Sequence, residues 1–179
     1  MKVVIDDRLP YVNRRNLGGG YYYPARLMGS KKSANGAYWS ALFEKAAGKF
    51  WCTYGHVEGG APAVAFSMLT GMPTRHIYLP QTSVDKHFKD LEEAVAKKWM
   101  MVVGNNLAVY GLPGNHAYSL MNTATLSDGT KLVKLRNPWG TEQYTGPYSD
   151  SKLTAAQIQE LGHVVKNDGV FWIDMNTFF

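Results

Sequence analysis

Apolar side chains recur at helical spacing in the first hundred residues. One such face comprises Trp39, Leu42, Phe43, Ala46 and Phe50. This pattern predicts a helix from about Ala37 to Phe50, with Asn35 or Gly36 as its cap. A second apolar face comprises Val84, Phe88, Leu91 and Val95. It predicts a helix from Ser83 to Lys98, whose terminal lysines suit the negative end of a helix dipole.

Further along, short apolar runs typical of β-strands dominate. Strands are expected at WMMVV, near residues 116–122 and 132–136, and at VFWID. The segment LSDGTK between the middle two strands contains Asp-Gly, a hairpin signal. A short helix is expected at 154–161, where Thr154 and Gln157 predict a capping box and Gly162 a C-terminal stop. Helices that precede an antiparallel sheet indicate the α+β class.

The segment HVEGGAP, residues 56–62, interrupts the helical pattern with glycines and a proline. A chain of 179 residues is long enough for one domain, or for two subdomains that share a cleft. We therefore expect a subdomain boundary at this segment.

Composition narrows the classes of function. The net charge is +5, but the lysines and arginines occur as scattered pairs, so we expect no nucleic-acid partner. No apolar run is long enough to span a bilayer, so we expect no membrane association. The single cysteine, Cys52, excludes an internal disulfide framework and a cysteine-based metal cluster. It favours a reducing, cytoplasmic location.

Two segments carry side chains suited to proton transfer: GNHAYSL at 114–120 and LRNPWG at 135–140. A nucleophile needs a base, and the base needs a third group that fixes its ring plane. His116 is a candidate for that base and Asn137 for the orienting group, since antiparallel strands joined by a hairpin bring such side chains within hydrogen-bond range. Trp139 is placed to cover the pair from water. The alternative is a structural histidine and an Asn-Pro turn.

Six segments, in the same order along nearly the whole chain, resemble the calpain family of papain-like cysteine peptidases. They are VVIDDRLP at 3–10, YWSALFEKAAGK at 38–49, GNHAYSL at 114–120, LRNPWG at 135–140, TGPYSD at 145–150 and DGVFW at 168–172. The resemblance implies a papain-like protease core, with residues 1–59 as the tail of its helical subdomain and residues 60–179 as its β-rich subdomain. It also implies that His116 is the catalytic base, Asn137 the orienting residue and Trp139 the indole that packs over them.

The family's nucleophile lies upstream of the VVIDDRLP-like segment, in a stretch ending in Gly-Asp-Cys-Trp, and this sequence contains no such stretch. Cys52 follows the first predicted helix, whose C-terminal dipole disfavours a thiolate. We therefore expect Cys52 to be a small, buried or partly buried apolar residue rather than a nucleophile. The 179 residues alone are predicted to be inactive as a peptidase.

Three functions stay open. In the first, the chain is the His/Asn-bearing portion of a thiol endopeptidase whose cysteine lies in residues outside this sequence or in another polypeptide. In the second, it is a non-catalytic homologue that serves as a structural or protein-binding module, for example in a cytoskeletal assembly. Both imply a protein substrate or a protein partner, and an apolar face on residues 1–59 needs a partner to cover it. A small basic binding domain without enzymatic ancestry has no positive support.

The peptidase chemistry requires no cofactor, but the resemblance also implies part of a calcium site. Carried over by position, it falls on Gln143, Asp150, Asp168 and Val170, where the family has glutamates at the first and last positions. Calcium prefers about six to eight oxygen ligands, several of them anionic, so an amide and an isopropyl group should weaken binding severely. The alternative is that Asp150 and Asp168 are loop residues beside turns.

The remaining histidines show no pairing at metal-ligand spacing, and we expect them at the surface or in packing contacts. They are His56, His76, His87 and His163.

Overall fold

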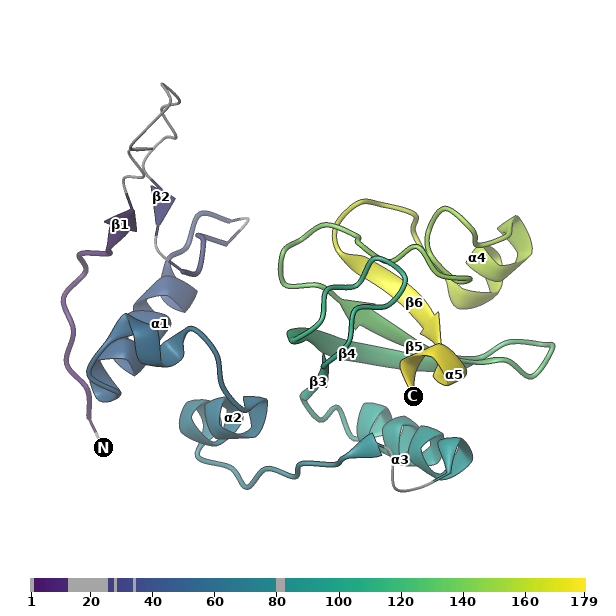
Figure 1. Ribbon diagram of the computed structural model, residues 1–179, viewed down its shortest axis with the longest axis horizontal. Coiled ribbons are helices and arrows are strands. Elements are labelled where there is room, and N and C mark those ends of the chain that lie inside the picture. Colours follow the sequence, from purple (N-terminus) through teal and green to yellow (C-terminus); the bar gives the residue numbers. More distant parts are fainter. Residues whose placement is uncertain (1, 13–25, 28, 34, 80–82) are drawn as a thin grey trace. The chain divides into compact units, whose positions relative to one another are not determined.

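The computed structural model describes residues 2–12, 26–27, 29–33, 35–79 and 83–179. The chain forms two compact units, residues 1–75 and 76–179 (Figure 1). Helices precede a four-stranded antiparallel sheet, and the predicted α+β class is therefore confirmed.

The first unit is mainly helical within its described residues. It contains β1 (Tyr11–Val12), which pairs antiparallel with β2 (Arg26–Leu27), then α1 (Trp39–Phe50), the 3-10 helix η1 (Tyr54–Val57) and α2 (Pro62–Thr70). The predicted first helix is present as α1, but its N-cap is Tyr38, so the prediction of Asn35 or Gly36 as the cap is wrong. The Asn35 side chain instead accepts from the Ala37 N–H at 3.3 Å, which closes a turn before the helix.

The segment HVEGGAP does not separate the two units. Its first two residues belong to η1, and its proline opens α2, where the missing N–H costs no helical hydrogen bond. The residues after α2 stay in the same unit as the helix, because Thr74 Oγ1 donates to the Ala63 carbonyl at 3.2 Å. The boundary between the compact units falls after Arg75, whereas the expected division between protease-core subdomains lies at residues 59 and 60. The correspondence to protease-core subdomains stays a prediction.

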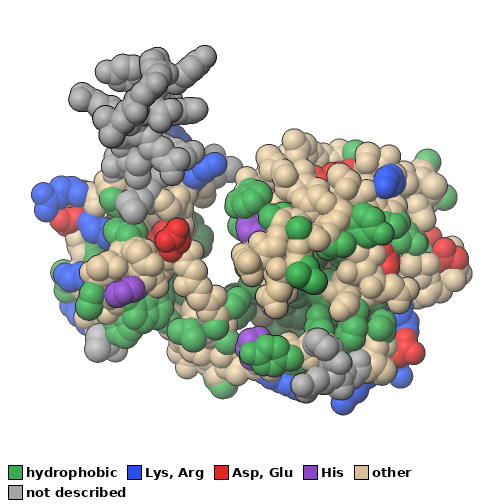
Figure 2. Space-filling model, viewed as in Figure 1, with side chains coloured by type: hydrophobic (Ala, Val, Ile, Leu, Met, Phe, Trp, Pro, Cys, Tyr) green, Lys and Arg blue, Asp and Glu red, His purple; other side chains and the backbone are tan. Residues whose placement is uncertain are grey.

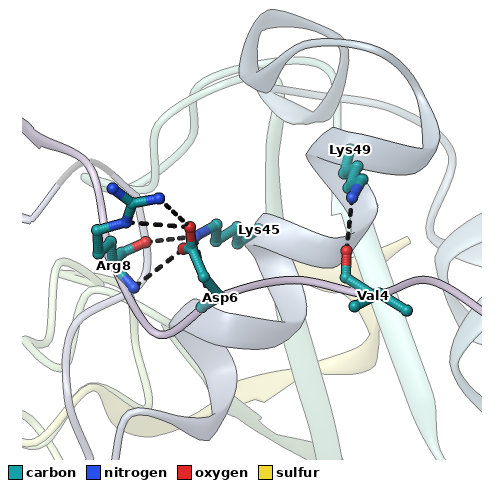
Figure 3. Close-up of polar contacts among 5 residues, drawn as sticks. All are labelled: Val4, Asp6, Arg8, Lys45 and Lys49. Carbon is teal, nitrogen blue, oxygen red and sulfur yellow. Dashed lines mark hydrogen bonds and ion pairs between the residues drawn. The ribbon is translucent and has the colours of Figure 1, made fainter.

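Two lysines of α1 hold the N-terminal segment against the helix (Figure 3). Lys49 Nζ donates to the Val4 carbonyl at 2.6 Å. Lys45 Nζ donates to the Arg8 carbonyl at 2.5 Å and to the Asp6 carboxylate. Lys45 and Arg8 together hold the pKa of Asp6 well below its ordinary value. Because this segment has no helix or strand of its own, the lysines bind backbone carbonyls that regular structure does not satisfy.

The second unit is built on one antiparallel sheet with the strand order β3-β4-β5-β6. Its elements are α3 (Val84–Ala96), β3 (Met101–Asn105), β4 (His116–Thr125), β5 (Lys131–Arg136), α4 (Ala155–Leu161), β6 (Val170–Asp174) and α5 (Met175–Phe178). The second predicted helix is present as α3, and the predicted strands are present as β3 to β6.

Local signals fix the ends of several of these elements. The predicted hairpin is present, with Thr125 opposite Lys131 at the turn between β4 and β5. Thr154 and Gln157 form the predicted capping box of α4. Gly162 ends α4 with a φ of 54°, a left-handed conformation that favours glycine.

Both faces of the sheet carry a hydrophobic core. On one face, the side chains of β4, β5 and β6 pack with Phe88 of α3 and Met175 of α5. On the other face, Trp172 of β6 packs in a cluster that includes α4. Leu132 and Val133 are neighbours in β5, yet both are completely buried, one in each core. The strand is therefore apolar on both sides, as expected for a strand that is covered by helices on both faces.

In the described part of the chain, no helix combines the length and the apolar character needed to cross a bilayer.

Replacing Lys45 by methionine tests the attachment of the N-terminal segment, since it removes the donor and keeps most of the side-chain length. We expect the Arg8 amide hydrogen, which Asp6 Oδ1 accepts at 3.1 Å, to exchange several-fold faster while those of α1 keep their protection, as measured by hydrogen–deuterium exchange. The matched control is Lys32→Met, at an exposed lysine. Equal exchange in the two variants would contradict the role given to Lys45.

Candidate active site

His116 is the first residue of β4, and a tight loop fixes its backbone. In the sheet register it lies opposite Asn105, the last residue of β3. The Asn105 side chain bridges the loop between them, because its Nδ2 donates to the Pro113 carbonyl at 2.9 Å. A Cβ at Gly114 would lie 2.8 Å from the Asn106 carbonyl oxygen, so the loop backbone approaches itself closely there. These contacts set where β4, and with it His116, begins.

Asn137 follows β5 directly and has no solvent exposure. Its N–H donates to the Gly169 carbonyl at 2.8 Å, and its carbonyl accepts from the Gly140 N–H at 3.0 Å. Gly169 has a φ of +85°, and a Cβ there would lie 2.8 Å from the Asn137 carbonyl oxygen. The backbone of Asn137 is therefore held on both sides, and glycine is needed at position 169 for both conformation and space.

The side chains of His116 and Asn137 meet in a hydrogen bond. His116 Nε2 lies 3.0 Å from Asn137 Oδ1, and the same oxygen accepts from the Trp139 N–H at 3.1 Å. Because the Trp139 N–H needs an acceptor, the amide is oriented with its oxygen towards both groups. Nε2 must then carry the proton, which leaves Nδ1 as the nitrogen that can accept one. No hydrogen bond joins Nδ1 to a described residue.

Two aromatic rings restrict the imidazole of His116. The Trp139 ring lies 4.4 Å away at 45°, and the Tyr118 ring lies 4.8 Å away, edge to face at 87°. Trp139 contacts the histidine but keeps 56% of its surface exposed, so it shields only one side. Burial raises the pKa of Tyr118, so its phenol stays neutral and does not compete with His116 as a base.

The three residues named from the sequence thus lie together: His116, Asn137 and Trp139. The arrangement can take a proton at Nδ1 while Nε2 stays anchored, which is what a base serving a nucleophile must do. Their catalytic roles stay predictions.

Cys52 belongs to the first unit and is exposed, so the expectation of a buried residue is wrong. Helix α1 ends at Phe50, before Cys52, and Cys52 takes a left-handed φ of 75°. It lies past the C-terminus of α1, where the helix dipole does not stabilise a thiolate.

The two carboxylates carried over for calcium have hydrogen-bond partners within the protein. Asp150 uses both carboxylate oxygens within the protein, with His163 Nε2 at 2.6 Å and the Lys166 N–H at 2.9 Å. Asp168 Oδ1 accepts from the N–H of Val170 at 3.0 Å, and Gln143 is exposed. Across the described residues, no group of three or more His, Cys, Asp or Glu side chains is arranged to hold a metal ion. Calcium therefore does not fit the residues present.

Asp150 has a partner that the sequence does not indicate. His163 is buried, with only 6% of its surface exposed. The expectation of a packing role is correct in part, but the specific contact with Asp150 was not foreseen. The two residues lie on different loops, and their spacing matches no known local motif, so no sequence signal indicates the pair.

Comparison with known proteins gives the family. The family described as calpain family cysteine protease matches residues 1–179. The chain belongs to this family. It is 31% identical to Calpain-12 of Homo sapiens, over 99% of this chain and 25% of that protein. It is also 31% identical to Calpain clp-1 of Caenorhabditis elegans, over 98% of this chain and 23% of that protein. The chain thus spans about a quarter of the length of these calpains.

The contact between Gly169 and Asn137 can be tested by Gly169→Ala. We expect this change to destabilise the second unit by about 1–3 kcal/mol, because the new Cβ would clash with the Asn137 carbonyl in addition to straining the backbone. Chemical denaturation measures the difference in free energy of unfolding.

The matched control for that experiment is Gly129→Ala in the β4–β5 turn. Gly129 has nearly the same φ, +86°, but nothing lies within 4 Å of the added Cβ. The control isolates the cost of backbone strain from the cost of the clash. An equal loss of stability in both variants would show that the contact with Asn137 contributes nothing.

Proposed function

We propose that this calpain-family chain is the His/Asn-bearing portion of a thiol endopeptidase and is inactive by itself. The observation that carries the proposal is the anchored imidazole: Nε2 of His116 is held by Asn137 Oδ1 at 3.0 Å, while Nδ1 has no partner among the described residues. A histidine needed only for packing has no use for a fully buried amide that fixes its tautomer. A general base needs this arrangement.

The missing component is a cysteine thiol from outside these 179 residues, since Cys52 lies past the C-terminus of α1, where the helix dipole does not stabilise a thiolate. The thiol gives its proton to His116 Nδ1, and the thiolate adds to the carbonyl carbon of a peptide bond. The C–N bond breaks as the imidazolium returns the proton to the leaving amine, and a thioester remains. Water then loses a proton to Nδ1 and attacks the thioester, which releases the carboxylic acid and the thiol.

The protein that carries this nucleophile should be found with the chain in its native cell. We would capture the native polypeptide with an antibody against residues 76–179, react it with a low concentration of tagged iodoacetamide, and map the label by mass spectrometry. The expected result is rapid labelling of a cysteine outside residues 1–179. Labelling confined to Cys52, at the rate of an ordinary exposed thiol, would overturn the proposal.

Substitutions in the complete enzyme separate the two roles at the site. We expect His116→Ala to lower kcat on the order of 10⁶-fold, as for loss of the base in a triad. Asn137→Ala should cost less, about 10²–10⁴-fold, because the base remains but its tautomer and ring plane are free. Hydrolysis of a fluorogenic peptide measures both.

Asn176→Ala, at an exposed asparagine of α5, is the matched control and should keep full activity. The isolated 179-residue chain should release no product above the buffer blank. Cleavage by the isolated chain, or full activity of the His116→Ala enzyme, would contradict the assignment.

A second candidate function, as a protein-binding homologue without catalysis, draws support from a different feature. Helix α1 carries a stripe of exposed aromatic side chains: Trp39 is 66% exposed, Phe43 is 42% and Phe50 is 45%. Their spacing places them on one helix face. Figure 2 shows hydrophobic side chains at the surface of both units. An apolar stripe of this kind is typical of an interface, and in either candidate function we propose that a protein covers it.

The uncovered stripe predicts that the isolated chain self-associates. The double variant Trp39→Ser/Phe43→Ser should shift the mass measured by light scattering towards a monomer. The matched control is Leu107→Ser in the second unit, where an apolar side chain is 79% exposed but stands outside the stripe. A clean monomer for the unmodified chain would count against an interface on α1.

A further inference from the structure

Two loops that flank Asn137 are joined by a set of hydrogen bonds. One loop, residues 141–150, follows Asn137, and the other, residues 163–169, precedes β6. The Glu142 N–H donates to Asn167 Oδ1 at 2.9 Å, which links the first loop to the second. Glu142 Oε1 also accepts from the Asp150 N–H at 3.0 Å, which closes the first loop on itself.

The centre of this set is the pair of Asp150 and His163. Asp150 Oδ1 lies 2.6 Å from His163 Nε2, so the two side chains are joined by a short hydrogen bond. The side chains are 7% and 1% exposed, respectively. Asp150 Oδ2 accepts from the Lys166 N–H at 2.9 Å, so both oxygens of the carboxylate join one loop to the other.

The acidic side chain of Glu142 lies close enough to the pair to interact with it electrostatically. Burial raises the pKa of Glu142, and the nearby carboxylates of Asp150 and Asp168 raise it further, whereas His163 lowers it. The imidazole therefore acts on this acidic group in the direction that a cation would. A calcium ion at Asp150 would have to displace His163, and it would leave a buried imidazole without its partner.

The second loop bears directly on the candidate active site. Gly169, at the end of this loop, supplies the carbonyl that accepts from the Asn137 N–H at 2.8 Å. Anything that fixes residues 163–169 to residues 141–150 therefore also limits the movement of Asn137.

We propose that the Asp150–His163 pair takes the place of a calcium ion between these loops and holds Asn137 in position without a metal. Asp150 and His163 are thus positioning residues, and the geometry of the His116–Asn137 pair is insensitive to calcium. The inference concerns the loops of the second unit and holds whether or not the chain serves a peptidase.

The first experiment uses the unmodified 179-residue chain. Thermal unfolding and isothermal titration are measured in millimolar calcium chloride and in EDTA, with magnesium chloride as a control for ionic strength. We expect the same melting temperature in all three solutions and no saturable heat of binding. A rise in melting temperature that is specific to calcium, or a saturable heat, would overturn the proposal, since a ligand that binds only the folded state must stabilise it.

The second experiment follows hydrogen–deuterium exchange in EDTA. His163→Ala should accelerate exchange at least tenfold in residues 141–150 and 163–170 and at the Asn137 amide, and it should lower the melting temperature by several degrees. The matched control is His76→Ala, at an exposed histidine of the same unit. A structural role confined to packing around α4 would loosen α4 and leave the Asn137 amide unchanged, which would also overturn the proposal.

The milder variant His163→Gln provides the same test if His163→Ala fails to fold, because its amide can still donate to Asp150 Oδ1. We expect partial protection of the two loops and of the Asn137 amide. Exchange identical to that of the unmodified chain in both variants would show that the pair does not hold the loops together.

Discussion

The hydrogen bond between His116 and Asn137 depends on the register of the central strands. Ser119 lies opposite Arg136 and Leu120 opposite Leu135, but beyond a bulge at Met121 the pairing shifts by one residue, with Asn122 opposite Lys134. In a strand, a shift of one residue turns every side chain to the other face. The bulge therefore allows the hairpin end of β4 and β5 and the end that carries His116 and Asn137 to keep separate registers, each with its apolar side chains in a core.

The burial of Asn137 restricts its movement but also costs free energy of folding. Asn137 is wholly buried, yet its Nδ2 has no hydrogen-bond partner among the described residues. A buried donor without a partner costs about 1–3 kcal/mol, so a sequence selected only for stability has a reason to replace it. The two cores on either side of the sheet supply the stability that tolerates this cost. Sites that break a local rule in this way are typical of functional positions.

Local patterns predicted the elements of the second unit well, because the signals lie within a few residues of one another. The Asp-Gly turn, the Thr154–Gln157 box and the apolar face of α3 are all decided by neighbours in sequence. The predicted hairpin between β4 and β5, together with the family motifs, also indicated that His116 lies close to Asn137. The family profile supports the same reading across the chain.

The errors have a common physical origin in contacts or backbone turns that no local pattern encodes. The expectation for Cys52 failed because α1 ends at Phe50, two residues before it, and Cys52 takes a left-handed φ of 75°. The Asp150–His163 pair joins two loops whose approach is decided by the sheet and by α4. Residue types alone indicated a weakened calcium site at Asp150. Only the fold shows that the imidazole of His163 already forms a hydrogen bond with the Asp150 carboxylate.

The difference between a metal and an imidazole at Asp150 changes what can control the site. A bound ion stabilises a structure in proportion to its free concentration, so it can act as a switch. A partner within the same chain has a fixed effective concentration and holds the loops under all such conditions. With Asn137 held in this way, the orientation of His116 is set by the fold itself, through its bond to Asn137 and its contact with Trp139. Under the proposed function, peptidase activity is then controlled by the access of a cysteine thiol to His116 Nδ1. These residues do not supply that thiol.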